Sequence, residues 1–179
     1  MRVVAGRFGG RRLKAPSGTA TRPTADRVRE ALFSALGPLD GEAVLDLFAG
    51  SGALGIEALS RGAGSAVFVE RDRRALAVLR ANLEALGLAA PEAVVRPGDA
   101  RAVLREAKGQ GAGYGLVFLD PPYRDAPGLG PELSDALPAL LAPGARVVCE
   151  SDRRAPLELD LPLVLDRRYG DTLLRIHHA

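Results

Sequence analysis

From residue 43 onwards, short apolar runs alternate with segments whose apolar residues recur at helical spacing. Apolar runs of four to six residues bounded by glycine, proline or acidic residues are typical of buried strands, and the longer periodic segments are typical of helices. The expected strands are Ala43–Phe48, Ser65–Glu70, Ala93–Arg96, Gly115–Leu119 and Ala145–Glu150. The expected helices are Ala53–Arg61, Arg73–Leu86, Ala100–Lys108 and Pro131–Leu141. Such alternation predicts βαβ units and a parallel sheet.

The two ends of the chain depart from this alternation. Thr24–Leu36 has the apolar spacing of a helix that ends at Gly37-Pro38. Before it, residues 2–16 contain three glycines and a proline among short apolar stretches, which predicts a small hairpin or an arm that orders on binding. After Ser151 the helical pattern stops. The last elements are then the two strands of an antiparallel hairpin: Leu157–Leu165 and Thr172–Ile176, joined through residues 167–171.

This order of elements predicts an α/β fold. We expect a mostly parallel, seven-stranded sheet with helices on both faces and the antiparallel hairpin at its C-terminal end. The length of 179 residues fits one domain with a sizeable core. We expect residues 1–21 to form a basic N-terminal arm or hairpin and residues 22–179 to form a single domain.

Composition excludes several classes of protein. A hydrophobic content of 47% with 26% charged residues is ordinary for a soluble globular protein, and no apolar run is long enough to span a bilayer. The N-terminus lacks the apolar core of a signal peptide, so we expect a cytoplasmic protein. We also expect a monomer. Cys149 is the lone cysteine, and His177 and His178 are the only histidines. We therefore expect no metal centre, no internal disulfide and no histidine general base.

The charge is distributed unevenly. Residues 1–30 carry eight basic and two acidic residues, a net charge of +6, whereas the rest of the chain is net −4. A basic segment on a mildly acidic body favours a polyanionic partner, although a solvated terminus is the alternative. Arginine binds phosphate in a forked geometry, so Arg7, Arg11 and Arg12 are candidates for phosphate contacts with such a partner.

A glycine-rich segment follows the first expected strand. Gly50, Gly52 and Gly55 match the pattern G-x-G-x-x-G, which supplies a tight turn, close approach of the backbone to a ligand and close helix packing. Glu70 falls 20 residues after Gly50, at the end of the next strand, where an acid binds two ribose hydroxyls. The segment therefore predicts a nucleoside-containing cofactor.

Two further acids distinguish between cofactors of this kind. Asp46, at the entry to the glycine segment, suits a cationic amino-acid group and repels a pyrophosphate. A simple strand-end cap is the alternative role for Asp46. In Gly98-Asp99-Ala100, after the third strand, Asp99 offers a carboxylate where an adenine amino group binds, and it is also a candidate helix N-cap. These acids favour S-adenosylmethionine over a dinucleotide.

Asp120-Pro121-Pro122-Tyr123 follows the apolar strand Gly115–Leu119. Ligands of open α/β sheets bind outside the carboxyl ends of the strands. The prolines fix two φ angles and remove two N–H donors, which leaves a stiff loop with free carbonyls beside an acid and a ring. Such a loop suits a planar group that carries an NH₂, although Asp-Pro-Pro alone is also ordinary turn chemistry.

Together these motifs resemble class I S-adenosylmethionine-dependent methyltransferases that act on exocyclic amino nitrogens. Arg22-Pro23-Thr24 with residues 26–30, the segment Leu47–Ala58 and the arginine-rich start are similar to one family in particular. That family is the bacterial 16S rRNA (guanine(966)-N2)-methyltransferases of the RsmD type. The resemblance covers nearly the whole chain and implies a Rossmann-like fold, with 16S rRNA in the small ribosomal subunit or its assembly intermediate as the partner.

The resemblance also implies roles for single residues. Acceptors for the two N–H bonds of the target amine would be Asp120 and the Pro121 carbonyl, and Tyr123 would stack on the flipped base. Arg22 would lie near the cofactor and contact RNA. The residues implied to hold S-adenosyl-L-methionine are Asp46, Phe48, Gly50 and Gly52 at the methionine part, Glu70 at the ribose, Asp99 and Ala100 at the adenine, and Asp120.

Other functions remain open at this level. The same chemistry on another amine, such as adenine N6 in RNA or DNA or a glutamine amide, fits the Asp120–Tyr123 motif equally well. A nicotinamide-dependent oxidoreductase would also use a glycine-rich segment. A noncatalytic RNA-binding protein on a methyltransferase scaffold is the third class.

Overall fold

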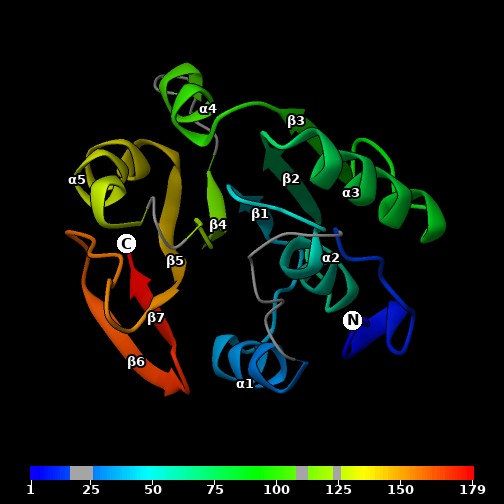
Figure 1. The fold of residues 1–179 in the computed structure, drawn as a ribbon, viewed down its shortest axis with the longest axis horizontal. Coiled ribbons are helices and arrows are strands. Elements are labelled where there is room, and N and C mark those ends of the chain that lie inside the picture. Colours follow the sequence, from blue (N-terminus) through cyan, green and yellow to red (C-terminus); the bar gives the residue numbers. More distant parts are fainter. Residues whose placement is uncertain (17–25, 108–112, 123–125) are drawn as a thin grey trace.

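The computed structural model describes residues 1–16, 26–107, 113–122 and 126–179, and places seven strands of these ranges in one sheet (Figure 1). The strands are β1 (Ala43–Asp46), β2 (Ser65–Glu70), β3 (Ala93–Pro97), β4 (Tyr114–Leu119), β5 (Leu141–Asp152), β6 (Leu163–Tyr169) and β7 (Thr172–His178). Their order is β3-β2-β1-β4-β5-β7-β6. The first five pair in parallel, and β7 pairs antiparallel with β5 and β6. The predicted α/β fold with a C-terminal antiparallel hairpin is confirmed.

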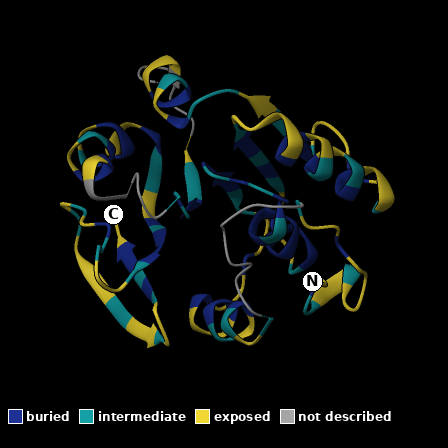
Figure 2. Ribbon diagram, viewed as in Figure 1, coloured by how far each residue is buried: buried dark blue, intermediate teal, exposed yellow. Residues whose placement is uncertain are grey.

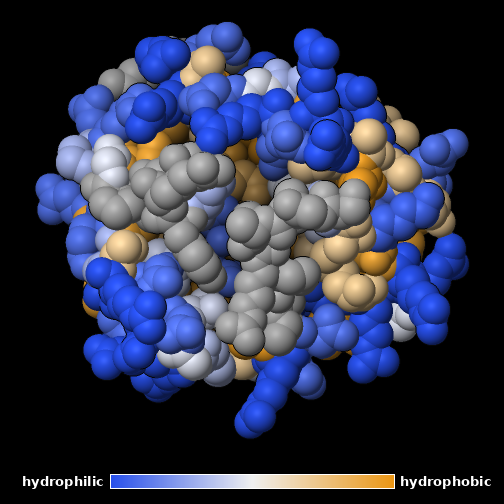
Figure 3. Space-filling model, viewed as in Figure 1, coloured by the Kyte–Doolittle hydropathy of each residue, from blue (hydrophilic) through white to orange (hydrophobic). Residues whose placement is uncertain are grey.

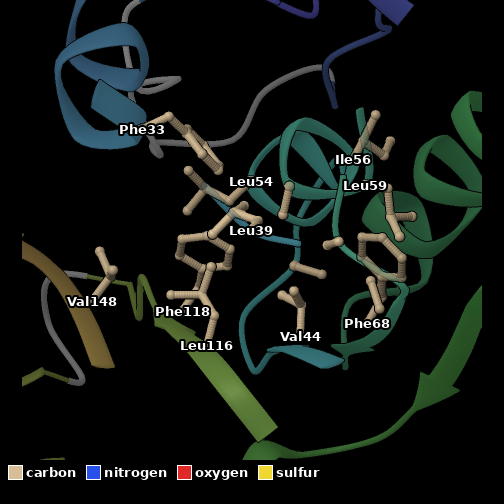
Figure 4. Packing of buried hydrophobic residues seen from close by; sticks show 14 of the residues in the cluster. Phe33, Leu39, Val44, Leu54, Ile56, Leu59, Phe68, Leu116, Phe118 and Val148 are labelled. Carbon is tan, nitrogen blue, oxygen red and sulfur yellow. The ribbon is translucent and has the colours of Figure 1, made fainter. Parts of the chain in front are cut away.

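Helices cover both faces of this sheet (Figure 1). They are α1 (Asp26–Leu36), α2 (Ala53–Ser60) and α3 (Arg73–Ala85) on one face, and α4 (Ala100–Ala107) and α5 (Ala126–Ala136), followed by the 3-10 helix η2 (Leu137–Leu140), on the other. Successive strand residues point to opposite faces, so each central strand contributes to two cores. Phe118 packs in the first core with the α1–α3 side chains, and its ring centroid lies 5.9 Å from that of Phe33 (Figure 4). Its neighbour Val117 packs in the second core, with the α4–α5 side chains.

Burial is concentrated in the central strands and in α2 (Figure 2). Cys149 of β5 is buried. The edge strand β6 is largely exposed, and Leu163 and Val164 are the large hydrophobic residues that it presents to solvent. Among the described residues, no helix combines the length and apolar character that a membrane crossing requires.

Residues 1–16 form an ordered hairpin that packs against the domain. Val3 and Arg11 are joined by a backbone hydrogen bond of 2.9 Å, and the short helix η1 (Gly6–Phe8) lies in the hairpin. The hairpin is fixed to α2 by the fully buried Glu57, whose carboxylate accepts from the backbone N–H groups of Val4 at 2.7 Å and Ala5 at 3.0 Å. The N-terminal segment is therefore packed against the domain as a hairpin.

Several expected elements were wrong in their boundaries: β1 is shorter than the expected strand, β5 and β7 are longer, and two further elements differ more. The helix expected at Pro131–Leu141 begins earlier, at Ala126, and carries Pro131 inside it. Proline is tolerated best in the first turn of a helix, where its missing N–H costs nothing. Within α5 the Ser134 Oγ donates to the Gly130 carbonyl at 2.8 Å, and it also accepts from the Asp160 N–H at 2.9 Å.

The strand expected at Leu157–Leu165 is shifted towards the C-terminus, to β6. Its first part is apolar because Leu157 is buried in the second core, with Leu159 and Leu161 packed against it, and not because it pairs in the sheet. The expected loop 167–171 shortens to a turn, because Tyr169 pairs with Thr172.

We predict that Glu57→Gln destabilises the fold by about 2 kcal/mol, because an amide cannot accept every bond that the buried carboxylate accepts from Val4, Ala5 and the Arg61 side chain. Urea unfolding measures the loss, and hydrogen exchange at Val4 and Ala5 shows that the hairpin is the part released. The matched control, Glu84→Gln on the exposed face of α3, should stay within about 0.5 kcal/mol of the unchanged protein. Equal effects of the two substitutions would contradict this role of Glu57.

Candidate active site

Three acidic residues meet at the carboxyl ends of the central strands. Asp46 ends β1, Asp120 follows β4 directly, and Glu150 lies near the end of β5. The register aligns Leu119 with Cys149, so Asp120 and Glu150 are neighbours on adjacent strands. All three acids fall on the sheet face that α1–α3 cover, because they share the alternation of the first-core residues in their strands.

Asp46 is held at this edge with one oxygen unused. Its Oδ2 accepts from the Gly55 N–H at 3.2 Å, whereas its buried Oδ1 has no hydrogen-bond partner among the described residues. Removal from water raises the pKa of Asp46 to about 7. The Gly55 N–H and, more weakly, the Phe48 N–H oppose this rise, and the negative charge of Glu70 adds to it. A cation that reached Oδ1 would satisfy this carboxylate.

The charged form of Asp120 is also destabilised by its surroundings. Burial raises the pKa of Asp120 well above its usual range, and the nearby charges of Glu150 and Asp46 raise it further. Because like charges at close range repel, the cluster favours either a bound proton or a positively charged ligand. Glu150, which is 4% exposed, is the site residue that sequence reasoning missed. The available signal was its place as the third acid at the end of a central strand.

The glycine segment turns the chain from β1 into α2 beside these acids. Gly52 has a φ of +82°, which glycine adopts without strain, and α2 begins at the next residue. A Cβ at Gly55 would overlap the ring of Phe68, so α2 packs on β2 only because this position is bare. Asn82 of α3 stabilises the glycine segment, because its Nδ2 donates to the Ser51 carbonyl at 2.9 Å.

Glu70 ties the end of β2 to the glycine segment. Its Oε2 accepts from the Gly50 N–H at 2.8 Å, and its Oε1 accepts from the N–H groups of Arg71 and Asp72 at 2.8 and 2.7 Å. A carboxylate offers about four acceptor positions, so this geometry leaves roughly one for a ribose hydroxyl. To accept hydrogen bonds from both ribose hydroxyls, Glu70 would have to share or release one of the hydrogen bonds that it accepts from backbone N–H groups.

The expected adenine side of the site is built around Asp99. Its Oδ1 accepts from the Arg101 N–H at 2.9 Å, which is the helix-capping role, and its Oδ2 lies 3.3 Å from an Arg71 nitrogen. Ala100 is buried in the second core, and Phe48 packs against that core.

Other expected site residues are placed in part. Pro121 is buried and Pro122 is partly buried, directly after Asp120. The expected roles of Tyr123 and Arg22 fall on residues outside the described ranges.

The N-terminal arginines lie on the exterior of the hairpin. The Arg7 guanidinium forms an ion pair with Glu92 and lies 4.5 Å from the Phe8 ring centroid. Arg11 donates to the Ala85 carbonyl at 3.0 Å, and Arg12 is exposed. Two of the three arginines thus have structural contacts, and their contact with RNA stays a prediction.

The raised pKa of Asp46 predicts a pH-dependent effect of Asp46→Asn on stability. Between about pH 4 and 7 the folded protein binds a proton at Asp46 that the unfolded chain does not, so stability from this group is lost as the pH rises towards 7. Asparagine lacks this titration. Between pH 5 and 8 the unchanged protein should therefore lose about 2 kcal/mol more of its unfolding free energy than the variant does. Urea titrations at both pH values measure this difference. The exposed control Asp40→Asn should show no such gain, and a pH-independent difference for Asp46→Asn would sink the assignment.

The chain was compared with known proteins. The family model described as "Conserved hypothetical protein 95" matches residues 1–178. The "Putative rRNA methyltransferase YlbH" of Bacillus subtilis is 49% identical over 126 residues, which cover 70% of this chain and 68% of that protein. The "Ribosomal RNA small subunit methyltransferase D" of Escherichia coli (strain K12) is 43% identical over 129 residues, which cover 69% of this chain and 61% of that protein.

A solved structure shares the whole fold. It is the "Putative methyltransferase yhhF from Escherichia coli", which superposes with a TM-score of 0.84 at 36% identity and covers 99% of this chain and 97% of that one. The fold, the motifs and these similarities agree, and the family predicted from the residues is confirmed. The chain therefore belongs to the "Conserved hypothetical protein 95" family, that of the RsmD-type proteins.

Proposed function

We propose that this protein transfers a methyl group from S-adenosylmethionine to the exocyclic N2 of a guanine in 16S rRNA, within the small ribosomal subunit or its assembly intermediate. The observation that carries the proposal is the convergence of Asp46 and Asp120 from adjacent strands, next to a glycine turn. One carboxylate suits the cationic cofactor and the other suits the target amine. The methyltransferase names of the relatives support the reaction, and two of those names support ribosomal RNA as its substrate.

The residues present fit the cofactor. The unused Oδ1 of Asp46 suits the ammonium of its methionine part, and Glu70 has an acceptor position for the ribose. Open space lies beside Gly50, where a Cβ would meet no atom closer than 4.0 Å. When bound, S-adenosylmethionine would supply a methyl group on a positively charged sulfur, and after transfer that sulfur is a neutral thioether.

Asp120 and the Pro121 carbonyl would orient the target amine. An exocyclic amine is a poor nucleophile because its lone pair is delocalised into the ring. Acceptors aimed at its two N–H bonds stabilise the tetrahedral geometry and the positive charge that develop on the nitrogen. Because attack needs alignment more than activation, the stiff loop after β4 contributes mainly by positioning.

Asp120 is also suited to take up the proton that the methylated nitrogen must lose. As the nitrogen–carbon bond forms and the carbon–sulfur bond breaks, the positive charge passes to the nitrogen. The methylated nitrogen then carries the positive charge and must lose one of its two protons. The burial and the neighbouring acids that raise the pKa of Asp120 then favour its protonation.

The acidic cluster argues against a dinucleotide. Asp46, Asp120 and Glu150 would face a pyrophosphate that carries their own sign of charge. Adenine N6 remains the nearest alternative target, because Asp120 and a carbonyl would orient it equally well. The choice of guanine N2 rests on the family to which the chain belongs.

We predict that Asp120→Asn lowers the rate of methyl transfer by about 100- to 1,000-fold, because the amide loses both the charge and one acceptor. Affinity for S-adenosylmethionine should change only a few-fold. Single-turnover transfer of a labelled methyl group measures the rate, and calorimetry measures the affinity. Asp40→Asn, the same change at an exposed position before β1, serves as control. Undiminished transfer by Asp120→Asn would remove Asp120 from the chemistry.

The target is tested by mass mapping. Small ribosomal subunits that lack the modification are incubated with the protein and S-adenosylmethionine, and the rRNA is digested to nucleosides and fragments. The proposal expects one N2-methylguanine in 16S rRNA. A methylated adenine, or transfer to protein alone, would replace this proposal with one of the alternatives.

A further inference from the structure

A transverse row of residues links the acidic cluster to the C-terminal hairpin. Asp120 lies beside Glu150, Glu150 pairs with Leu174 of β7, and Leu174 pairs with Arg167 of β6. Paired residues of neighbouring strands share a face of the sheet. Leu174 belongs to the first core, as do the partly buried Leu165 and Tyr169 that flank Arg167 at alternate positions. Arg167 therefore projects from the face that carries Asp120.

Arg167 is within reach of a polymer bound at that site. Neighbouring strands lie about 4.8 Å apart, so three strand steps place its backbone roughly 14 Å from Asp120. The residue is exposed and forms no ion pair with another described residue; its guanidinium donates to the Asp166 carbonyl at 3.1 Å. The Asp166 carboxylate is bound to Arg175. An RNA strand that leaves the target base would pass an available guanidinium.

The end of the hairpin adds positive charge at the same edge. The antiparallel register of β5 and β7 pairs Asp152 with Thr172, so the β6–β7 turn lies at the carboxyl end of the parallel strands. Arg153 and Arg154 follow β5 there and share the single carboxylate of Asp171, at 3.2 and 3.9 Å. With Asp152 included, these neighbours remain balanced in charge, so Arg167 adds net positive charge on the face of the hairpin that carries Asp120.

This surface lies on the other side of the acidic cluster from the N-terminal hairpin. Figure 1 shows β6 and β7 at one side of the molecule and the N-terminal hairpin at the other, with the carboxyl ends of β1 and β4 between them. Figure 3 shows hydrophilic side chains gathered over the β6–β7 hairpin. A strand that crosses the site would meet basic residues on both sides.

We infer that Arg167 binds the phosphate backbone of the RNA next to the target nucleotide, on the flank opposite the N-terminal hairpin. The guanidinium matches a phosphate with two parallel hydrogen bonds. The contact positions the RNA and carries no base specificity. The inference extends the proposed function, because it assumes that the acidic cluster receives a nucleotide.

The test compares three charge reversals in the full chain. Arg167→Glu changes the proposed contact. Arg168→Glu makes the same change at the next residue, on the opposite face of β6, and Arg80→Glu makes it on the exposed side of α3. Each protein is titrated with a short fluorescein-labelled single-stranded RNA over a series of KCl concentrations.

Arg167→Glu should weaken RNA binding about tenfold and reduce the magnitude of the salt slope by about one, while both controls stay within about twofold. Circular dichroism and S-adenosylmethionine affinity should be unchanged for all three variants. Equal weakening by all three would assign the effect to net charge and overturn the inference, as would an unaffected Arg167→Glu or an unchanged protein that does not bind the RNA.

Methyl transfer by the unchanged protein to unmodified small ribosomal subunits is measured in parallel. If no transfer occurs while Arg167→Glu still weakens RNA binding selectively, the proposed function fails and the RNA contact stands. If transfer occurs while Arg167→Glu behaves like Arg80→Glu, the proposed function stands and the inference fails.

Discussion

Burial of several carboxylates at the end of one parallel sheet costs free energy. The arrangement of the site depends on what offsets this cost, either a bound proton or a cationic ligand. Asp46 and Asp120 lie near Glu150 on one face, and both have pKa values raised mainly by removal from water. A cationic ligand would relieve the repulsion and satisfy the unused Oδ1 of Asp46. The same electrostatics that strain the free protein therefore select the charge of what it binds.

The rest of the fold keeps these acids from moving apart. Asp46 and Asp120 lie at the ends of adjacent strands whose side chains are packed in two cores, and the Phe33 and Phe118 rings pack together in the first of these (Figure 4). Bonds from Gly55 to Asp46 and from Gly50 to Glu70 join the glycine segment to two strand ends. A rigid frame prevents the carboxylates from turning into solvent, which keeps the cluster poised for a cation.

The N-terminal hairpin shows that a basic segment can serve the fold itself. Its core residues Val3 and Leu13 are buried, and Glu57 accepts two of its backbone N–H groups. Arg7 pairs with Glu92, so part of the basic excess serves the fold. The hairpin is thus a fixed platform at one side of the site, and β6–β7 is its counterpart at the other.

Much of this architecture could be predicted from the sequence. Ser65–Glu70 was predicted to the residue, because an apolar run bounded by glycine and an acid is typical of a buried strand. The spacing of Glu70 from Gly50 predicted an acid for the ribose, and the bond that Glu70 accepts from the Gly50 N–H was not foreseen. Leu157–Leu161 was assigned to a strand because its leucines alternate with other residues, as in a strand. An irregular segment whose leucines pack against a core can show the same sequence pattern.

Single acids were harder to interpret. Glu57 lies in an otherwise apolar helix, and nothing near it in the sequence indicates that it accepts N–H groups from residues more than 50 positions away. Glu150 looked like an ordinary strand end until the register placed it beside Asp120. The roles of Tyr123 and Arg22 stay predictions.

Proton release on cofactor binding tests the central claim most directly. S-adenosylmethionine is titrated into the protein at pH 6.5 by calorimetry, in buffers that differ in ionisation enthalpy. If the acidic cluster receives the cofactor's positive charge, binding lowers the raised pKa values of Asp46 and Asp120, and about one proton is released per cofactor bound. Binding with no release at this pH would contradict the account, because the cluster would then not respond to the cation it is inferred to hold.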